Sequence, residues 1–306
     1  MDNEPSQIRQ STVEGGKDAD PSKNILKSSQ RKLAQFLVGS KSQVVQTGTG
    51  EPHLQYYFAG SFATGLLSQA TEITDLDGTS ISEGSSQQNA ITKETTDKFN
   101  DCLRLIGDVD YVALDKGFPI VRDGKVIYSY DNFPDDAKPA FKTSANSPRV
   151  ITVMEDISVG RDKHRVAKIL IDGEEYYIES PDAQLGGKVL QILSNCNTTK
   201  SNPYSAELID TINRDFESLI IALGRIYNRS QLLDTAYQMM LEVNRLPSSY
   251  DDGLIRHRRP KFPYDFIAVL RNSDYSPTVH TFFKDLEELD NTKEHALEPL
   301  HENDLE

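Results

Sequence analysis

Two short motifs combine residue types that handle phosphates and divalent metal ions. Gly60-Ser61 follows an apolar segment, and a turn of this kind that opens a helix presents free backbone N–H groups to a phosphate. In Asp108-Val109-Asp110 the two carboxylates point to the same side of a strand, because side-chain direction alternates along it. Mg²⁺ prefers a few such hard oxygen ligands together with substrate phosphate. The motifs therefore predict a site that holds a nucleotide through Mg²⁺ or Mn²⁺.

The flanking sequence supplies the elements that must position these motifs. The run LQYYFA at 54–59 favours a strand, and FATGLLSQA at 62–70 favours a helix. Gly60-Ser61 then lies at a strand-to-helix turn. The segment 107–114 (GDVDYVAL) is rich in β-branched and aromatic residues, which favours a second strand that carries Asp108 and Asp110. Between these elements, residues 71–95 have the composition of an insertion with little periodicity.

Beyond residue 180 the pattern changes from strands to helices. Ser180-Pro181-Asp182 is a typical helix start, with a capping serine, a proline at the first helical position and an acid in the first turn. Apolar residues recur at helical spacing in several of the segments that follow. The helices are expected at 182–194, 205–228, 230–245 and 278–290, and earlier strands at 149–154, 165–171 and 175–178, with a hairpin at 118–130.

These patterns predict an α/β (α+β) fold with a mixed sheet, followed by a helical domain. The ranges are a disordered tail at 1–27, the α/β domain at 28–180, the helical domain at 181–290 and an acidic tail at 291–306. We expect the active site to lie between the two domains.

The order of these elements resembles the nucleotidyltransferase superfamily with a polymerase β-type core. Its members have an apolar strand, Gly-Ser, a helix and then Asp-x-Asp on the next strand, as at Gly60-Ser61 and Asp108-Val109-Asp110 here. More specifically, the chain resembles the AbiEii-type branch, which includes toxins of abortive-infection and toxin–antitoxin systems. The similarity extends over about residues 50–225.

Two further motifs of that branch match later segments of this chain. Its Ser-Pro-Glu/Asp helix with a following lysine corresponds to Ser180-Pro181-Asp182 and Lys188, and its Arg/Lys-Asp pair to Arg214-Asp215. The resemblance implies that Lys188 contacts the nucleotide phosphates and that Asp215 orients this lysine or assists the acceptor. It also implies an NTP as substrate, an RNA, tRNA or protein as acceptor, and an antitoxin as partner.

The metal pair has a rival in this sequence. The 46 residues at 62–107 separate the Gly-Ser turn from Asp108 by far more than is usual in the family, whereas Asp75 and Asp77 have the ordinary spacing. We favour Asp108 and Asp110 because they lie on an apolar strand, while Asp77 runs directly into a turn sequence.

The third carboxylate of the core is unassigned. The strand expected at 165–171 carries Lys168 at an inward position and is followed by Asp172. Some AbiEii-type proteins resemble this chain in using a strand lysine, which makes Lys168 a candidate nucleotide-binding residue.

Composition narrows the class of partner. A formal net charge of -14 argues against a broad electrostatic nucleic-acid binder, although the segment 255–261 (IRHRRPK) offers a local basic patch. The two cysteines, Cys102 and Cys196, predict neither a disulfide framework nor a zinc site. Apolar runs fall short of the roughly 20 residues of a membrane span, and the N-terminus has no secretory pattern. We expect a cytoplasmic protein without a membrane partner.

Two other hypotheses remain open, because each motif is short. Gly60-Ser61 is also typical of a simple tight connection, Lys188 of a helix-surface lysine, and Arg214-Asp215 of an exposed charge pair. A nucleotidyltransferase-like protein that has lost catalysis would bind Mg²⁺·NTP without transferring it. An unrelated α/β protein with accidental motifs would do neither.

Overall fold

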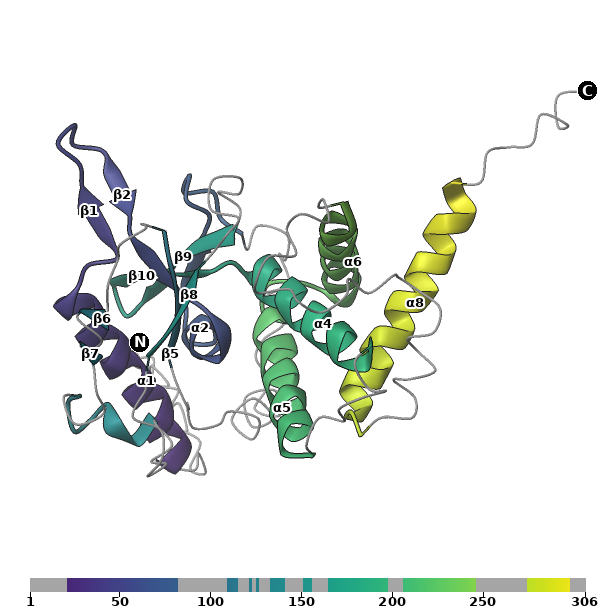
Figure 1. The fold of residues 1–306 in the computed structure, drawn as a ribbon, viewed down its shortest axis with the longest axis horizontal. Helices are drawn as coiled ribbons and strands as arrows, with labels where there is room; N and C mark the ends of the chain where they lie inside the picture. The colour runs from purple at the N-terminus through teal and green to yellow at the C-terminus, as the bar shows by residue number, and fades with distance from the viewer. Residues whose placement is uncertain are drawn as a thin grey trace, which may run out of the picture.

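The chain forms a mixed α/β half followed by an all-helical half (Figure 1). The computed structural model describes residues 21–81, 109–114, 121–122, 125–126, 133–140, 151–155, 165–197, 206–245 and 274–297. The α/β class expected from the sequence is confirmed at this level.

A mixed six-stranded sheet with the order β4-β9-β10-β3-β5-β8 forms the centre of the first half. The strands are β3 (Tyr56–Phe58), β4 (Glu72–Thr74), β5 (Val109–Ala113), β8 (Ile151–Glu155), β9 (Val166–Ile171) and β10 (Glu174–Glu179). β3 runs parallel to β10 and antiparallel to β5, which is parallel to β8. Two short hairpins stand apart from it, β1 (Val44–Gln46) with β2 (Pro52–Leu54) and β6 (Val121–Arg122) with β7 (Lys125–Val126).

One face of this sheet is covered by helices. Phe58 on β3 and Tyr111 on β5 point to the same side, and both are almost completely buried. α1 (Pro21–Ser40) and α2 (Gly60–Leu67) contribute Leu33 and Phe62 to the same core. Burial of these large side chains is the main favourable term that holds the helices on the sheet. A smaller apolar cluster around Tyr57 lies on the other face.

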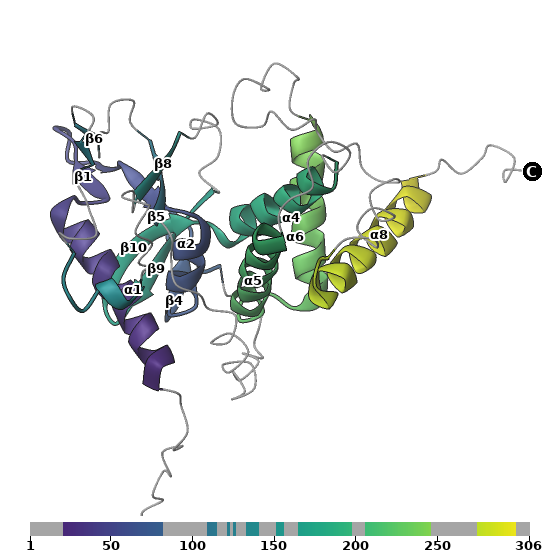
Figure 2. The ribbon, with the colours of Figure 1, turned by 60° about the horizontal axis from the view of Figure 1, so that its bottom comes forward.

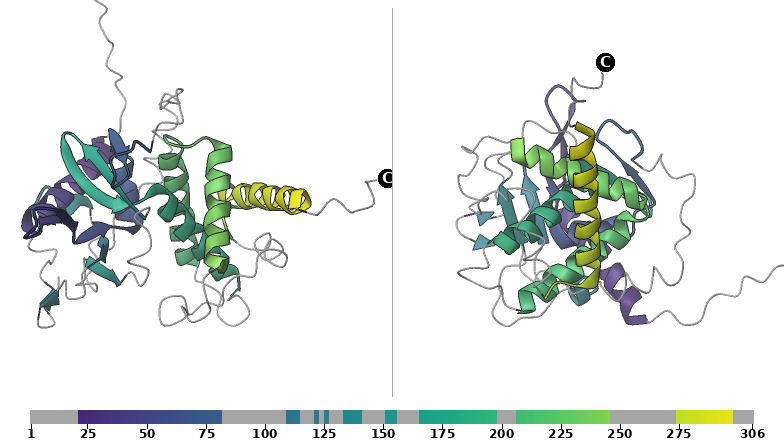
Figure 3. Two further views of the ribbon diagram at one scale, coloured as in Figure 1. Left: turned by 90° about the horizontal axis from the view of Figure 1, so that it is seen from above. Right: turned by 90° about the vertical axis from the view of Figure 1, so that its right-hand side faces the viewer.

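The second half consists of α4 (Pro181–Asn197), α5 (Ala206–Leu223), α6 (Arg229–Arg245) and α8 (Pro277–Leu297). α8 lies at the outer end of this half, farthest from the sheet (Figure 3). Phe216 of α5 meets Phe282 and Phe283 of α8, with ring centroids 5.2 and 6.3 Å away. These aromatic contacts fix α8 to the bundle.

Several boundaries differ from the sequence-based expectation. α1 begins at Pro21, inside the range expected to be disordered, and α8 continues to Leu297, inside the acidic tail. β4 forms within the segment expected to be an irregular insertion, because its residues pair with β9. The segment 94–105, whose apolar residues Phe99 and Leu103 at helical spacing predict a further helix, lies outside the described residues. None of the helices in the described ranges combines the length and the apolar character that crossing a membrane requires.

Candidate active site

Three strands bring their residues together at one end of the sheet, here called the site end. β3 and β10 are parallel, with Phe58 in register with Ile178, so both strands finish at this end and lead into α2 and α4. β5 is antiparallel to β3, so its first residues lie at the same end. The backbone N–H of Ala59 donates a hydrogen bond of 2.9 Å to the carbonyl oxygen of Asp110. The topology therefore places the predicted Gly-Ser turn beside the predicted aspartate strand.

Gly60 and Asp110 are in direct contact. Gly60 has a φ of +61°, a left-handed conformation that glycine adopts without strain. A Cβ atom at this position would lie 2.5 Å from Oδ2 of Asp110. Asp110 lies between Val109 and Tyr111, which are buried on the helix-covered face, so its side chain projects to the other face and stays half-buried. The site needs a glycine here because the carboxylate occupies the space of a side chain.

The N-cap residue of α2 makes no side-chain hydrogen bond to the helix. This residue is Ala59, whose side chain cannot accept a hydrogen bond, and the first turn of α2 contains no acid. The first helical hydrogen bond runs from Ala63 N–H to the carbonyl of Ala59 at 3.2 Å. The N–H groups at the beginning of a helix have no intrahelical partner and carry the positive end of the helix dipole. Gly60 and Ser61 are only partly buried, so a ligand can reach them.

The structure brings together a second predicted pair, Lys188 and Asp215. Nζ of Lys188 on α4 lies 3.0 Å from Oδ2 of Asp215 on α5, and the side chains are 18% and 9% exposed. Nζ also donates to Oε1 of Gln191 at 3.1 Å. Arg214 points elsewhere, to Asp210 at 3.2 Å, and both of those side chains are exposed. Asp215 therefore offsets the cost of burying the lysine charge.

Two residues that the sequence did not single out connect these pairs. Thr64, one turn after Gly60 on α2, donates from Oγ1 to Oε1 of Gln184 at 2.9 Å. Gln184, one turn before Lys188 on α4, donates from Nε2 to the carbonyl of Glu179 at 2.7 Å. Both side chains are buried. The only signal in the sequence is their spacing of four residues from a predicted site residue, which places each on the same helix face as that residue.

The chain has no match among protein-family models, curated proteins or solved structures.

Lys168 lies away from the site end of the sheet, where β3 and β10 finish. It is on β9, and β10 and β3 separate β9 from β5, which corresponds to about 14 Å at the usual strand spacing. Its Nζ pairs with Glu175 at 3.1 Å, a residue nearer the opposite end of the strands. The structure does not bring Lys168 to Gly60 or Asp110.

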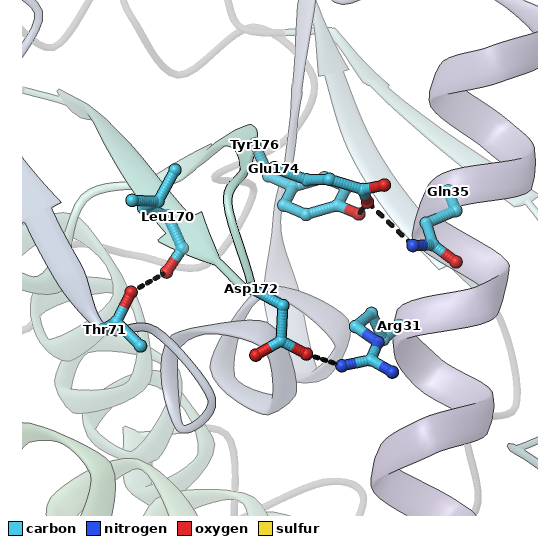
Figure 4. Close-up of polar contacts among 7 residues, drawn as sticks. All are labelled: Arg31, Gln35, Thr71, Leu170, Asp172, Glu174 and Tyr176. Atoms are coloured by element: carbon cyan, nitrogen blue, oxygen red, sulfur yellow. Dashed lines mark hydrogen bonds and ion pairs between the residues drawn. The ribbon is translucent and has the colours of Figure 1, made fainter.

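Asp172 belongs to the opposite end of the sheet, in the turn between β9 and β10. It is bonded to Arg31 of α1, and the neighbouring Glu174 accepts hydrogen bonds from Gln35 at 2.8 Å and Tyr176 at 2.5 Å (Figure 4). These contacts hold α1 on the hairpin. Asp172 therefore has a structural role in the described part of the chain.

The rival aspartates follow β4, the edge strand on the far side of the sheet. β4 is four strands from β5, about 19 Å at the usual spacing. Oδ1 of Asp75 accepts the backbone N–H of Thr79 at 2.8 Å, which closes a tight turn. Asp77 is exposed in that turn. The described residues thus place Asp110, and not Asp75 or Asp77, against the Gly-Ser turn.

The donor set for a metal ion is incomplete in the described residues. Asp108 lies outside them, and no group of three Asp, Glu, His or Cys residues within them is arranged to hold a metal ion. On β8, the residue in register with Asp110 is Thr152. The Asp110 carboxylate, packed against Gly60 at the start of α2, is the feature that fits a hard divalent cation. A carboxylate oxygen and a phosphate oxygen can bind one such ion together.

Proposed function

We propose that this protein transfers a nucleotide from an NTP to an acceptor, and that the reaction takes place at Gly60, Ser61 and Asp110. The observation that supports it most is the contact of the Asp110 carboxylate with Gly60 at the uncapped start of α2. A phosphate group and a metal-binding carboxylate are needed side by side in nucleotidyl transfer. This contact supplies a place for both.

In this proposal the backbone N–H groups of Gly60 and Ser61 bind the triphosphate. Asp110, with Asp108 two residues earlier in the sequence, would hold Mg²⁺ or Mn²⁺, which neutralises phosphate charge when bound. The acceptor hydroxyl oxygen forms a bond to the α-phosphorus. The bond from that phosphorus to the oxygen of the β-phosphate breaks, pyrophosphate leaves with the electron pair, and the hydroxyl proton passes to solvent.

Lys188 serves as a fixed cation in this scheme. Its ammonium has two acceptors among the described residues, Asp215 and Gln191, and an ammonium has a third N–H group to offer a phosphate oxygen. The buried pair with Lys188 favours an orienting role for Asp215 over that of a base. RNA, tRNA or a protein remains the proposed acceptor, and an antitoxin the proposed partner.

Transfer of radioactive label tests the proposal. Each of the four NTPs, labelled at the α-phosphate, is incubated with the protein and a cell extract, and RNA and protein fractions are counted. The wild type is expected to move label from at least one NTP, and Asp110→Ala is expected to move none. The matched control is Asp75→Ala, which keeps activity. Equal labelling by wild type and Asp110→Ala contradicts the assignment.

The absence of a carboxylate at the β8 position in register with Asp110 favours a second candidate function. A protein with this fold and an incomplete metal site would bind Mg²⁺·NTP and act as a binding protein. Saturable NTP binding, together with no label transfer to any fraction of the extract, identifies this case.

A further inference from the structure

The turn that joins α5 to α6 reaches into the first half of the molecule. It comprises residues 224–228, between Leu223 and Arg229. Ile226 in the middle of this turn is 3% exposed and belongs to the large apolar core. α5 itself contacts α2 (Figure 2). The residues on either side of Ile226 make polar contacts with α2 and α4.

Arg225 caps the C-terminal end of α2. Its guanidinium donates to the carbonyl oxygens of Ser68 at 2.6 Å, Ala70 at 2.9 Å and Leu67 at 3.4 Å. The last carbonyls of a helix have no intrahelical partner and carry its negative end, so a buried cation satisfies them. Burial lowers the pKa of Arg225, and burial followed by the Arg225 charge lowers the pKa of the nearby Lys27.

Tyr227 contacts the beginning of α4. Its hydroxyl donates to Oδ1 of Asp182 at 2.5 Å, and Asp182 lies in the first turn of α4. Burial, followed by the charge of Asp182, raises the pKa of Tyr227, so the phenol remains a donor at neutral pH. One short turn therefore holds both helices that begin at the candidate active site.

We propose that residues 224–228 position the active site from outside it. Arg225 fixes the position of α2, and Tyr227 fixes the position of α4. The inference rests on the proposed nucleotide site. α2 has eight residues and is about 12 Å long, so it behaves as one rigid rod. A shift at its Arg225 end moves Gly60 and Ser61 at the other end. Arg225 and Tyr227 are positioning residues, because neither lies among the residues proposed to contact the nucleotide.

The test measures binding of Mg²⁺ complexes with the four α,β-methylene NTPs, which cannot release pyrophosphate, by isothermal titration calorimetry. Arg225→Ala is expected to raise the Kd about tenfold, because the N–H groups at the start of α2 lose their alignment with the phosphate; tenfold corresponds to about 1.4 kcal/mol of binding free energy. Tyr227→Phe, which removes only the hydroxyl, is expected to raise it about threefold. Guanidinium, added below denaturing concentrations, is expected to restore binding to Arg225→Ala.

Arg229→Ala is the matched control. Arg229 is four residues away, pairs with Asp285 at 2.6 Å and lies over the ring of Phe282, so it contacts α8 and not α2. The Arg229→Ala protein is expected to bind the nucleotide complexes with the wild-type Kd. This holds even if its melting temperature falls as much as that of Arg225→Ala.

Wild-type Kd values in folded Arg225→Ala and Tyr227→Phe overturn the inference. If Arg225→Ala does not fold, Arg225→Lys replaces it, because the lysine keeps the charge but loses the forked donor group. Wild-type Kd values in both Arg225→Lys and Tyr227→Phe have the same consequence. If the wild-type protein binds none of the four complexes, the proposed nucleotide site itself is contradicted. This outcome differs from failure of the positioning inference, in which the wild type and the variants bind equally well.

Discussion

α2 and α4 begin side by side at the end of parallel strands, yet their first turns differ. α4 is capped by Ser180, whose Oγ accepts the backbone N–H of Ala183 at 3.3 Å, and its first turn contains Asp182. α2 follows Ala59, has no acid in its first turn, and begins with a glycine in the left-handed region. A serine cap satisfies backbone N–H groups at the start of α4, whereas the residue before α2 offers no such cap. In the proposed function, the N–H groups at the start of α2 bind the triphosphate, and α4 contributes Lys188, about two turns after its start.

Gly60→Ala breaks this contrast most severely. The new Cβ would lie 2.5 Å from Oδ2 of Asp110, and alanine is strained at a φ of +61°. We expect NTP binding to weaken by about a hundredfold, or about 2.8 kcal/mol, because both the turn and the carboxylate must move. Calorimetric titration with Mg²⁺·NTP measures the loss. Gly78→Ala is the control for left-handed strain alone, since its Cβ would meet nothing within 4 Å.

Lys188→Met sharpens the contrast from the side of α4. Removing the ammonium while keeping the length of the side chain is expected to raise the Kd of Mg²⁺·NTP about thirtyfold, because a charge-assisted hydrogen bond to phosphate, worth about 1.5–3 kcal/mol, is lost. Asp215→Asn is expected to have a smaller effect in the same direction. Lys168→Met serves as the control, and an effect equal to that of Lys188→Met would contradict the placement of the site.

Ser180→Ala removes the cap of α4 and makes the two helix starts alike. We expect the free energy of unfolding to fall by about 1 kcal/mol. The affinity for Mg²⁺·NTP is expected to stay unchanged, because this cap satisfies the protein and not the ligand. Urea denaturation and calorimetry on the same preparation measure the two quantities. A large loss of affinity without a loss of stability would place the start of α4 in the ligand site.

The smallest effect is expected at the other end of the sheet. Hydrogen bonds from Tyr176 and then Gln35 lower the pKa of Glu174. A lowered pKa in the folded state contributes stability that is present above the unfolded pKa of about 4.3 and is lost as the pH falls through the folded pKa. With Glu174→Gln, the loss of unfolding free energy between neutral and acid pH is expected to be a few tenths of a kcal/mol smaller than in the wild type. The effect is small because the carboxylate is exposed and solvent screens its interactions. Urea midpoints at neutral and acid pH measure it.

Local sequence signals were sufficient for the main elements. The β-rich run around Tyr111 and the Ser-Pro-Asp start at residue 180 specify β5 and α4 through nearby residues alone. β4 was missed because its three residues become a strand only by pairing with β9. The start of α1 was missed because the composition of its first seven residues is typical of disorder.

The candidate site was predictable only where its motifs are local. Gly60-Ser61 and the aspartate strand were found from residue types and spacing, and the Lys188–Asp215 pair only through a family resemblance. Gln184 and Arg225 carry no local signal, because their partners Thr64 and Ser68 are 120 and 157 residues away in the sequence. Long-range side-chain contacts of this kind leave no periodic signal.

Binding of Mn²⁺ in the presence of NTP tests the central claim most directly, because the paramagnetic ion reports its own coordination by electron paramagnetic resonance. The wild type is expected to bind Mn²⁺·NTP, Asp110→Asn to lose this binding, and the double variant Asp75→Asn/Asp77→Asn to keep it. Undiminished binding by Asp110→Asn, or its loss in the double variant, would contradict a nucleotide site at Gly60 and Asp110.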